Sequence, residues 1–139
     1  MTTSKLQLAI EAVVDLVTAV GGINHAPDYP PESPNVFPFL VCYAGGGDYS
    51  YNSPGEMVGM HNIIVELHIN RKELPLDVEK LMAFSNSIPE AIMSSYTLNG
   101  TCDTLGSVGY RISDVKWANI DTIALIFEIR NVKIREDFA

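Results

Sequence analysis

Cysteine and basic residues are scarce in this chain, and long apolar runs are missing. Its 139 residues include 2 cysteines, and 9 lysines and arginines stand against 17 aspartates and glutamates, for a formal net charge of −8. Two cysteines without a secretory signal favour buried free thiols over a disulfide. No apolar segment approaches the roughly 20 residues that a membrane-spanning helix needs. We expect a single cytoplasmically made domain over residues 1–139.

The charge balance also bears on nucleic acid. The positive residues are scattered from Lys5 to Arg135, with no basic cluster. An acidic surface repels phosphate backbones, so sequence-specific binding of nucleic acid is not expected. An acidic wall that DNA merely slides past remains compatible with this composition.

The motifs of common enzyme sites are missing as well. Gly45-Gly46-Gly47 lacks the lysine and hydroxyl residue of a phosphate-binding loop and is followed by Asp48. His61 and His68 are an odd number of residues apart on one predicted strand, so they point to opposite faces. No pattern of zinc ligands or of an activated nucleophile accompanies them. We predict a protein that is not an enzyme and binds no cofactor or metal, with a small-ligand-binding domain as the less favoured alternative.

The clearest structural signal is the stretch from His61 to Arg71, which alternates with a period of two. Its apolar side holds His61, Ile63, Val65, Leu67 and Ile69. A later stretch from Asp121 alternates in the same way, with Ile123, Leu125, Phe127 and Ile129 on one side. Each pattern predicts a strand with one face in a core and the other mostly exposed. Val132 and Ile134 change parity, so we expect the last strand to bend or end near Asn131.

Two segments have helical spacing. The first can be capped by Thr3 or Ser4 and ends at Gly21-Gly22, because glycine accepts a left-handed conformation at little cost. Its apolar stripe is formed by Leu6, Ile10, Val13, Val17 and Val20. The second runs from Val78 to Ile92, and Pro89 predicts a kink or a restart within it.

Two segments rich in turn residues separate these elements. Residues 23–38 contain five prolines, which exclude a helix or a central strand and predict an extended connection. Residues 44–59 read as a long turn-rich loop between two strands. The predicted fold class is therefore α+β, with two helices packed on one face of a largely antiparallel four-stranded sheet. The element order is α-β-β-α-β-β, with a long β–β loop.

The run G-G-I-N-H-A-P-D-Y-P-P-E-S-P-N-V-F-P-F, after an amphipathic helix, resembles small tail proteins of long-tailed bacteriophages. The run H-N-I-I-V-E-L-H-I-N-R-K-E-L-P and the terminal strands fit the same pattern, so the resemblance extends from about Leu6 to Ile134. Within that set, the element order is similar to that of tail terminator proteins. The resemblance implies a structural protein of the virion tail or neck, assembled in the bacterial host cytoplasm. It would form a hexameric ring at the head-proximal end of the tail tube, stop tube polymerisation and provide the head-docking surface. The alternative is a head–tail connector or stopper ring on the portal side of the neck.

The resemblance also implies partners and surfaces. The partners are further copies of the chain, the tail tube protein and a connector or stopper protein. DNA would pass through the lumen without sequence-specific binding, and no membrane is involved. A ring needs two complementary surfaces on each subunit, and tyrosine is favoured at such surfaces. The interface candidates are Tyr29, Pro30, Pro31, Phe37, Tyr49, Tyr51 and Met57. Asp48 and Glu56 are the candidates for the lumen.

Overall fold

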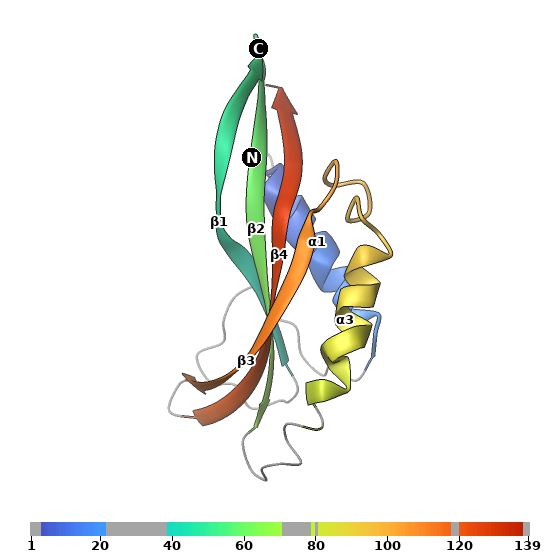
Figure 1. Ribbon diagram of the computed structural model, residues 1–139, viewed down its shortest axis with the longest axis vertical. Helices are drawn as coiled ribbons and strands as arrows, with labels where there is room; N and C mark the ends of the chain where they lie inside the picture. The colour runs from blue at the N-terminus through green and yellow to red at the C-terminus, as the bar shows by residue number, and fades with distance from the viewer. Residues whose placement is uncertain (1–3, 22–38, 71–78, 80, 118–119, 138–139) are drawn as a thin grey trace.

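The computed structural model (Figure 1) describes residues 4–21, 39–70, 79, 81–117 and 120–137. The elements are α1 (Lys5–Thr18), β1 (Phe39–Ser53), β2 (Glu56–Asn70), α3 (Phe84–Met93), β3 (Ser107–Trp117) and β4 (Ile120–Asp137). The four strands form one sheet of order β1-β2-β4-β3, in which every neighbouring pair is antiparallel. The predicted α+β class and the order α-β-β-α-β-β are confirmed. No helix in these described ranges is long and apolar enough to cross a membrane.

Helix α1 begins after one of its predicted caps and ends at Thr18, slightly before the predicted glycines. The Ser4 hydroxyl accepts a hydrogen bond from the Gln7 amide at 3.1 Å, which satisfies one of the free donors of the first turn. The helix ends at Thr18, and Gly21 then takes a left-handed φ of 89°. Its buried face consists of Ala9, Ile10, Ala12, Val13 and Val17. The spacing of three and four residues thus forms one apolar stripe against the sheet.

The core lies between the two helices and one face of the sheet, which we call the helix face. Both helices lie on the same side of the strands (Figure 1). The helix face of β2 contributes Ile63, Val65, Leu67 and Ile69, and that of β4 contributes Ile123, Leu125, Phe127 and Ile129, all of them buried. The period of two therefore located the core correctly in both central strands.

The second helix departs from its prediction in one detail. The expected restart at Pro89 is wrong, because α3 runs through that residue from Phe84 to Met93. The interruption falls earlier, at Ala83, which is a turn between the helical residues 81–82 and α3. A proline ring removes only one helical hydrogen bond. Ile88 and Ile92, both fully buried, hold α3 against the core on either side of it.

The opposite face of the sheet, which we call the open face, is not mostly exposed as predicted. Near its centre several side chains are buried, namely Val41, Glu66, His68, Thr122, Ala124 and Ile126. They come from three adjacent strands, since Glu66 pairs with both Val41 and Ile126. The alternation in β2 identifies the helix face correctly, but it does not indicate that part of the other face is also buried.

A polar network connects these strands across the open face. The Glu66 carboxylate accepts hydrogen bonds from the Tyr43 hydroxyl and from Nε2 of His68, the latter at 2.8 Å. Nδ1 of His68 lies 2.9 Å from the Thr122 hydroxyl. Burial alone would raise the pKa of Glu66, but the hydrogen bonds from His68 and Tyr43 and the charges of His68 and Arg111 lower it below its usual value. The carboxylate therefore stays ionised within the sheet.

Removal of this carboxylate is expected to destabilise the fold. Glu66→Ala leaves the fully buried His68 without its acceptor, so the free energy of unfolding should fall by roughly 3 kcal/mol. Glu128→Ala is the matched control, because its 2.7 Å pair with Arg130 is exposed on both sides and should contribute less than about 1 kcal/mol. Urea denaturation measures both. Equal losses in the two variants would contradict the network.

The direction of the Glu66 pKa shift also determines a pH dependence. A carboxyl whose pKa is lower in the folded state stabilises fully above its unfolded pKa, about 4.3 for glutamate. This contribution disappears as the pH falls from there through the lower folded pKa. The stability difference between the wild type and Glu66→Ala should therefore be constant near neutrality and shrink below about pH 4. A difference that stays unchanged down to acid unfolding would show that Glu66 titrates normally.

Candidate assembly interface

The segment predicted as a long β–β loop is instead the far end of a hairpin. Strands β1 and β2 are each 15 residues long, and only Pro54 and Gly55 separate them. Gly55 has a φ of 79°, a conformation that suits glycine in a tight turn after proline. The expectation of a loop over residues 44–59 is therefore wrong. The hairpin and the end of β4 extend beyond both helices (Figure 1).

The third strand of this extension is the part of β4 that follows a bulge. Asn131 has a φ of 57°, and the pairing of β2 with β4 shifts there by one residue, between Ile63↔Ile129 and His61↔Val132. The predicted bend near Asn131 is confirmed, but β4 continues to Asp137. We define the arm as residues 46–53 of β1, 56–61 of β2 and 132–137 of β4.

Two aromatic rings occupy the space above glycines in the arm. The rings of Tyr49 and His61 meet edge to face with centroids 5.0 Å apart. A Cβ at Gly59 would lie 2.3 Å from Nε2 of His61 and 2.9 Å from Cε1 of Tyr49. At Gly47 it would lie 2.8 Å from Nδ1 of His61. The glycines are therefore packing positions for the rings, an arrangement known to reinforce glycines in strands.

His61 is buried at the base of this ring pair. Burial lowers its pKa, and the carboxylate of Glu136 offsets part of that shift. The imidazole thus behaves as a packed neutral ring. His68 lies on the opposite face of β2, as the odd spacing predicted. The described residues contain no group of three histidine, cysteine or acidic side chains close enough to hold a metal ion.

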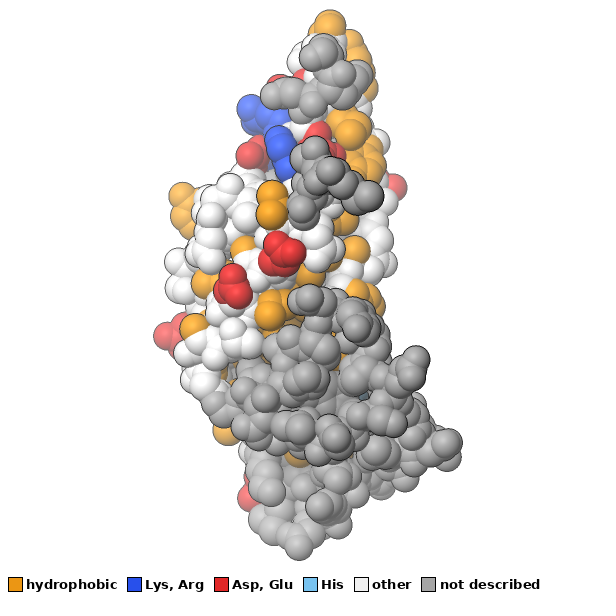
Figure 2. All heavy atoms as spheres, turned by 180° about the vertical axis from the view of Figure 1, so that it is seen from behind, with side chains coloured by type: hydrophobic (Ala, Val, Ile, Leu, Met, Phe, Trp, Pro, Cys, Tyr) orange, Lys and Arg blue, Asp and Glu red, His pale blue; other side chains and the backbone are white. Residues whose placement is uncertain are grey.

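The predicted interface and lumen residues fall on different faces of the arm. Tyr49 pairs with Gly59 and Tyr51 with Met57, which places these side chains on the helix face. Tyr49 is 55% exposed and Tyr51 is 73% exposed, so neither is covered by its own domain. Figure 2 shows hydrophobic side chains running along this upper part of the molecule. The arm therefore presents an exposed aromatic surface.

Asp48 and Glu56 lie on the open face of the arm. Asp48 is exposed and pairs with Met60. Glu56 accepts a hydrogen bond from Asn52 and lies 3.8 Å from Nε of Arg135, which is also 3.6 Å from Asp103. The charge of Glu56 is thus partly compensated.

Four predicted interface residues cannot be compared, because Tyr29, Pro30, Pro31 and Phe37 lie outside the described residues. Two further exposed side chains, Tyr110 (61%) and Ile112 (39%) on β3, were not predicted from the sequence. Their alternation with polar residues resembles that of a buried strand face. They are exposed because β3 is an edge strand. The position of a strand in the sheet cannot be predicted from the alternation of its own residues.

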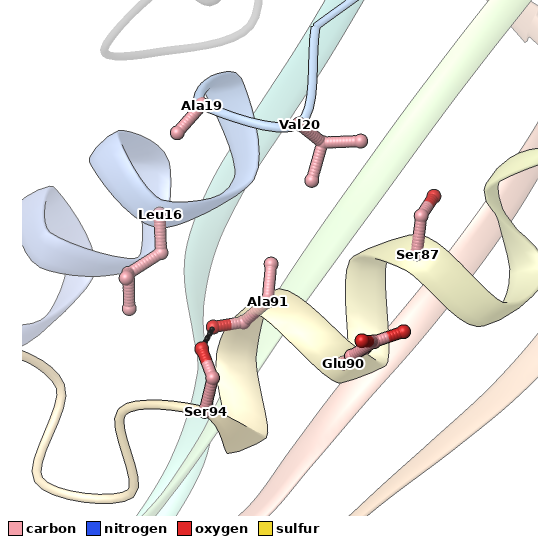
Figure 3. Close-up of a pocket in the computed structure, with 7 residues that line it drawn as sticks. All are labelled: Leu16, Ala19, Val20, Ser87, Glu90, Ala91 and Ser94. Carbon is pink, nitrogen blue, oxygen red and sulfur yellow. Dashed lines mark hydrogen bonds between the residues drawn. The ribbon is translucent and has the colours of Figure 1, made fainter.

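An open cleft of about 460 Å³ lies between the end of α1 and α3 (Figure 3). Its walls are mostly small or apolar, with Leu16, Ala19, Val20 and Ala91, and Glu90 is its one charged side chain. The Ser94 hydroxyl donates to the Ala91 carbonyl at 2.8 Å and is thereby occupied within its own helix. The cleft does not gather the convergent polar groups that fix a small ligand.

The glycine packing predicts how the arm responds to an added methyl group. Gly59→Ala should displace Tyr49 or His61 and lower the free energy of unfolding by about 1–3 kcal/mol. Gly45→Ala is the comparison variant, because its new methyl would meet the aliphatic side chain of Ile64, 2.8 Å from Cγ1 and 3.0 Å from Cδ1, and no aromatic ring. Thermal unfolding and amide exchange in residues 46–61 measure the effects. A variant at Gly59 that is as stable as the one at Gly45 would contradict the proposed packing.

Comparisons with known proteins find only remote structural likenesses. No protein-family model matches the chain, and no curated protein matches it either. Among solved structures, the chain is similar to one chain of a structure described as "Virion of native gene transfer agent (GTA) particle". The two share 16% sequence identity, the alignment covers 91% of this chain and 94% of that one, and the TM-score is 0.49. A likeness this remote decides neither the family nor the function.

Proposed function

We propose that this chain is a structural protein of a bacteriophage virion, built as a single domain over residues 1–139. In the virion it acts as a tail terminator: a hexameric ring at the head-proximal end of the tail tube stops tube polymerisation and provides the surface onto which the head docks. The observation that carries the proposal is the arm. A three-stranded extension with exposed tyrosines projects from a fold whose element order is the one that the sequence resemblance implies.

The arm suits contact with another protein on physical grounds. Tyr49 and Tyr51 offer large apolar area with few rotatable bonds, so ordering them at an interface costs little entropy. The arm is also held rigid by pairing on both sides of β2 and by the ring contact of Tyr49 with His61. A preorganised surface loses less freedom on binding than a mobile loop does. The tail tube protein and neighbouring copies are the partners we propose for it.

The open face is our proposed lining of the lumen. Two of the arginines on this face are accompanied by carboxylates, since Arg130 pairs with Glu128 and Arg135 lies near Glu56 and Asp103. Paired guanidinium groups release few counterions on meeting phosphate, so they hold DNA weakly. Together with exposed Asp48, this arrangement fits a channel through which DNA passes without sequence-specific binding.

Electron microscopy of particles made without this chain tests the proposal. Overlong tails of variable length, separate from filled heads, are expected because tube growth would have lost its stop. Tails of normal length beside unjoined heads would instead indicate a connector or stopper ring. Intact, infectious particles would overturn both virion roles.

A point substitution tests the arm itself. Tyr51→Ser is expected to leave thermal stability within about 0.5 kcal/mol, because this side chain is largely exposed. It should reduce the fraction of correctly terminated, head-joined tails. Tyr96→Ser is the matched control, since Tyr96 is 63% exposed but lies in the turns after α3 and is not one of the arm residues. Equal assembly defects in the two variants would count against a specific role of the arm.

A further inference from the structure

The sheet has two edges, β1 and β3, each with another described strand on only one side. An unpaired strand edge presents backbone N–H and C=O groups that bind a further strand readily. Ten consecutive residues of β1, Tyr43–Asn52, are exposed. This stretch contains no proline or lysine, the residues that commonly protect such an edge. Its Tyr, Ser, Gly and Asn composition is instead typical of surfaces that bind proteins.

The topology makes the two edges complementary in direction. Each strand is antiparallel to its neighbours, and the sheet has four strands, so β1 and β3 run in opposite directions. If a second copy is placed beside the first in the same orientation, β3 of one copy meets β1 of the next as an antiparallel pair. The helix faces of the two copies then lie on the same side. A heterologous contact of this kind is the one that builds rings.

The side chains of the two edges are complementary as well. On the helix face, Tyr49 and Tyr51 of β1 correspond to Tyr110 of β3, which pairs with buried Phe127 and is 61% exposed. On the open face, exposed Asp48 of β1 corresponds to exposed Arg111 of β3. Aromatic pairs and opposite charges directly across two strands are both stabilising.

We propose that β3 of one copy pairs with β1 of the next, with Asp48 opposite Arg111 and Tyr49 opposite Tyr110, so that neighbouring copies share one continuous sheet. This single register satisfies both the charge pair and the aromatic pair. It also places Val108 opposite Tyr51, an aromatic and β-branched pair of the kind that strands favour. The inference rests on the proposed ring and identifies the surface by which its subunits join.

The register implies a stagger between copies. Within one sheet, Tyr110 lies level with Cys42 through Phe127 and Val65. In the proposed pairing, Tyr110 of the neighbouring copy lies opposite Tyr49, whereas Tyr110 of the same copy lies level with Cys42. The neighbouring β3 is therefore shifted along β1 towards the arm by roughly 20 Å, at about 3.3 Å per residue. A sheet that closes on itself requires such a stagger, because its strands must tilt against the axis. The part of β1 that extends past β3 in its own sheet thus gains a partner.

Charge reversal tests the pair. Asp48→Arg and Arg111→Asp should each weaken self-association of the purified protein roughly tenfold or more, because like charges then face each other across the junction. The double variant should associate as the wild type does. An equimolar mixture of the two single variants should also recover, since each junction then holds one arginine and one aspartate. Sedimentation velocity up to about 1 mM protein measures association. Absence of rescue in both the double variant and the mixture overturns the proposal.

Cysteine cross-linking tests the register. D48C in one tagged chain and R111C in a second should form a disulfide under mild oxidation. The native thiols should not interfere, because both are buried, which raises the pKa of Cys42 to about 12 and that of Cys102 to about 11. The control pair is S50C with S113C, on the same edges and face but not opposed. A disulfide in the control pair alone, or in neither pair with a monomeric wild type, overturns the shared sheet.

Failure of this inference differs from failure of the proposed function. Uncontrolled tail length without the chain, combined with no D48C–R111C disulfide, leaves the terminator role standing and removes the shared sheet. The disulfide with intact, infectious particles in the absence of the chain supports the shared sheet and removes the tail role.

Discussion

The pairing of β2 with β4 is the constraint on which the rest of this structure depends. It runs from Glu56↔Asp137 in the arm to Asn70↔Thr122 at the other end. At its centre both faces are buried, with Val65 and Phe127 under the helices and Glu66 and Ile126 on the open face. Outward from this pair, β1 and β3 each pair with a described strand on one side only. The core, the rigid arm and the two edges all follow from that arrangement.

The buried polar network carries a cost in folding free energy. Burying Glu66 and His68 is unfavourable unless each finds a partner, and an apolar pair of similar size would be at least as stable. The network instead makes the stability of the sheet depend on the register of its strands. Glu66 contacts Tyr43 on β1, and His68 contacts Thr122 on β4, so a one-residue slip of either strand would remove one hydrogen bond from the buried pair of Glu66 and His68. We interpret it as a device that fixes strand register.

Sequence reasoning succeeded where one period dominated. The alternation of Ile63, Val65 and Leu67, and the helical stripe after Ser4, identified the core faces and the element order. It failed at residues 44–59, because glycine, serine and asparagine were read as turn residues. There the glycines provide room for rings from the facing strand, a relation between Gly59, Tyr49 and His61 that appears only once the strands are paired. Sorting of Tyr51 and Asp48 onto opposite faces likewise required the observed register.

The separation of the arm's strands along the chain has a consequence during synthesis. Met57 of β2 pairs with Glu136 of β4, so the hairpin emerges from the ribosome long before its third strand. At about 5–20 residues per second, several seconds separate the two events. During that interval the hairpin lacks the strand that pairs along β2, and non-local pairings of this kind form late. Until β4 arrives, the edge of β2 that it will cover is open, and an unpaired strand edge of this kind binds other strands readily.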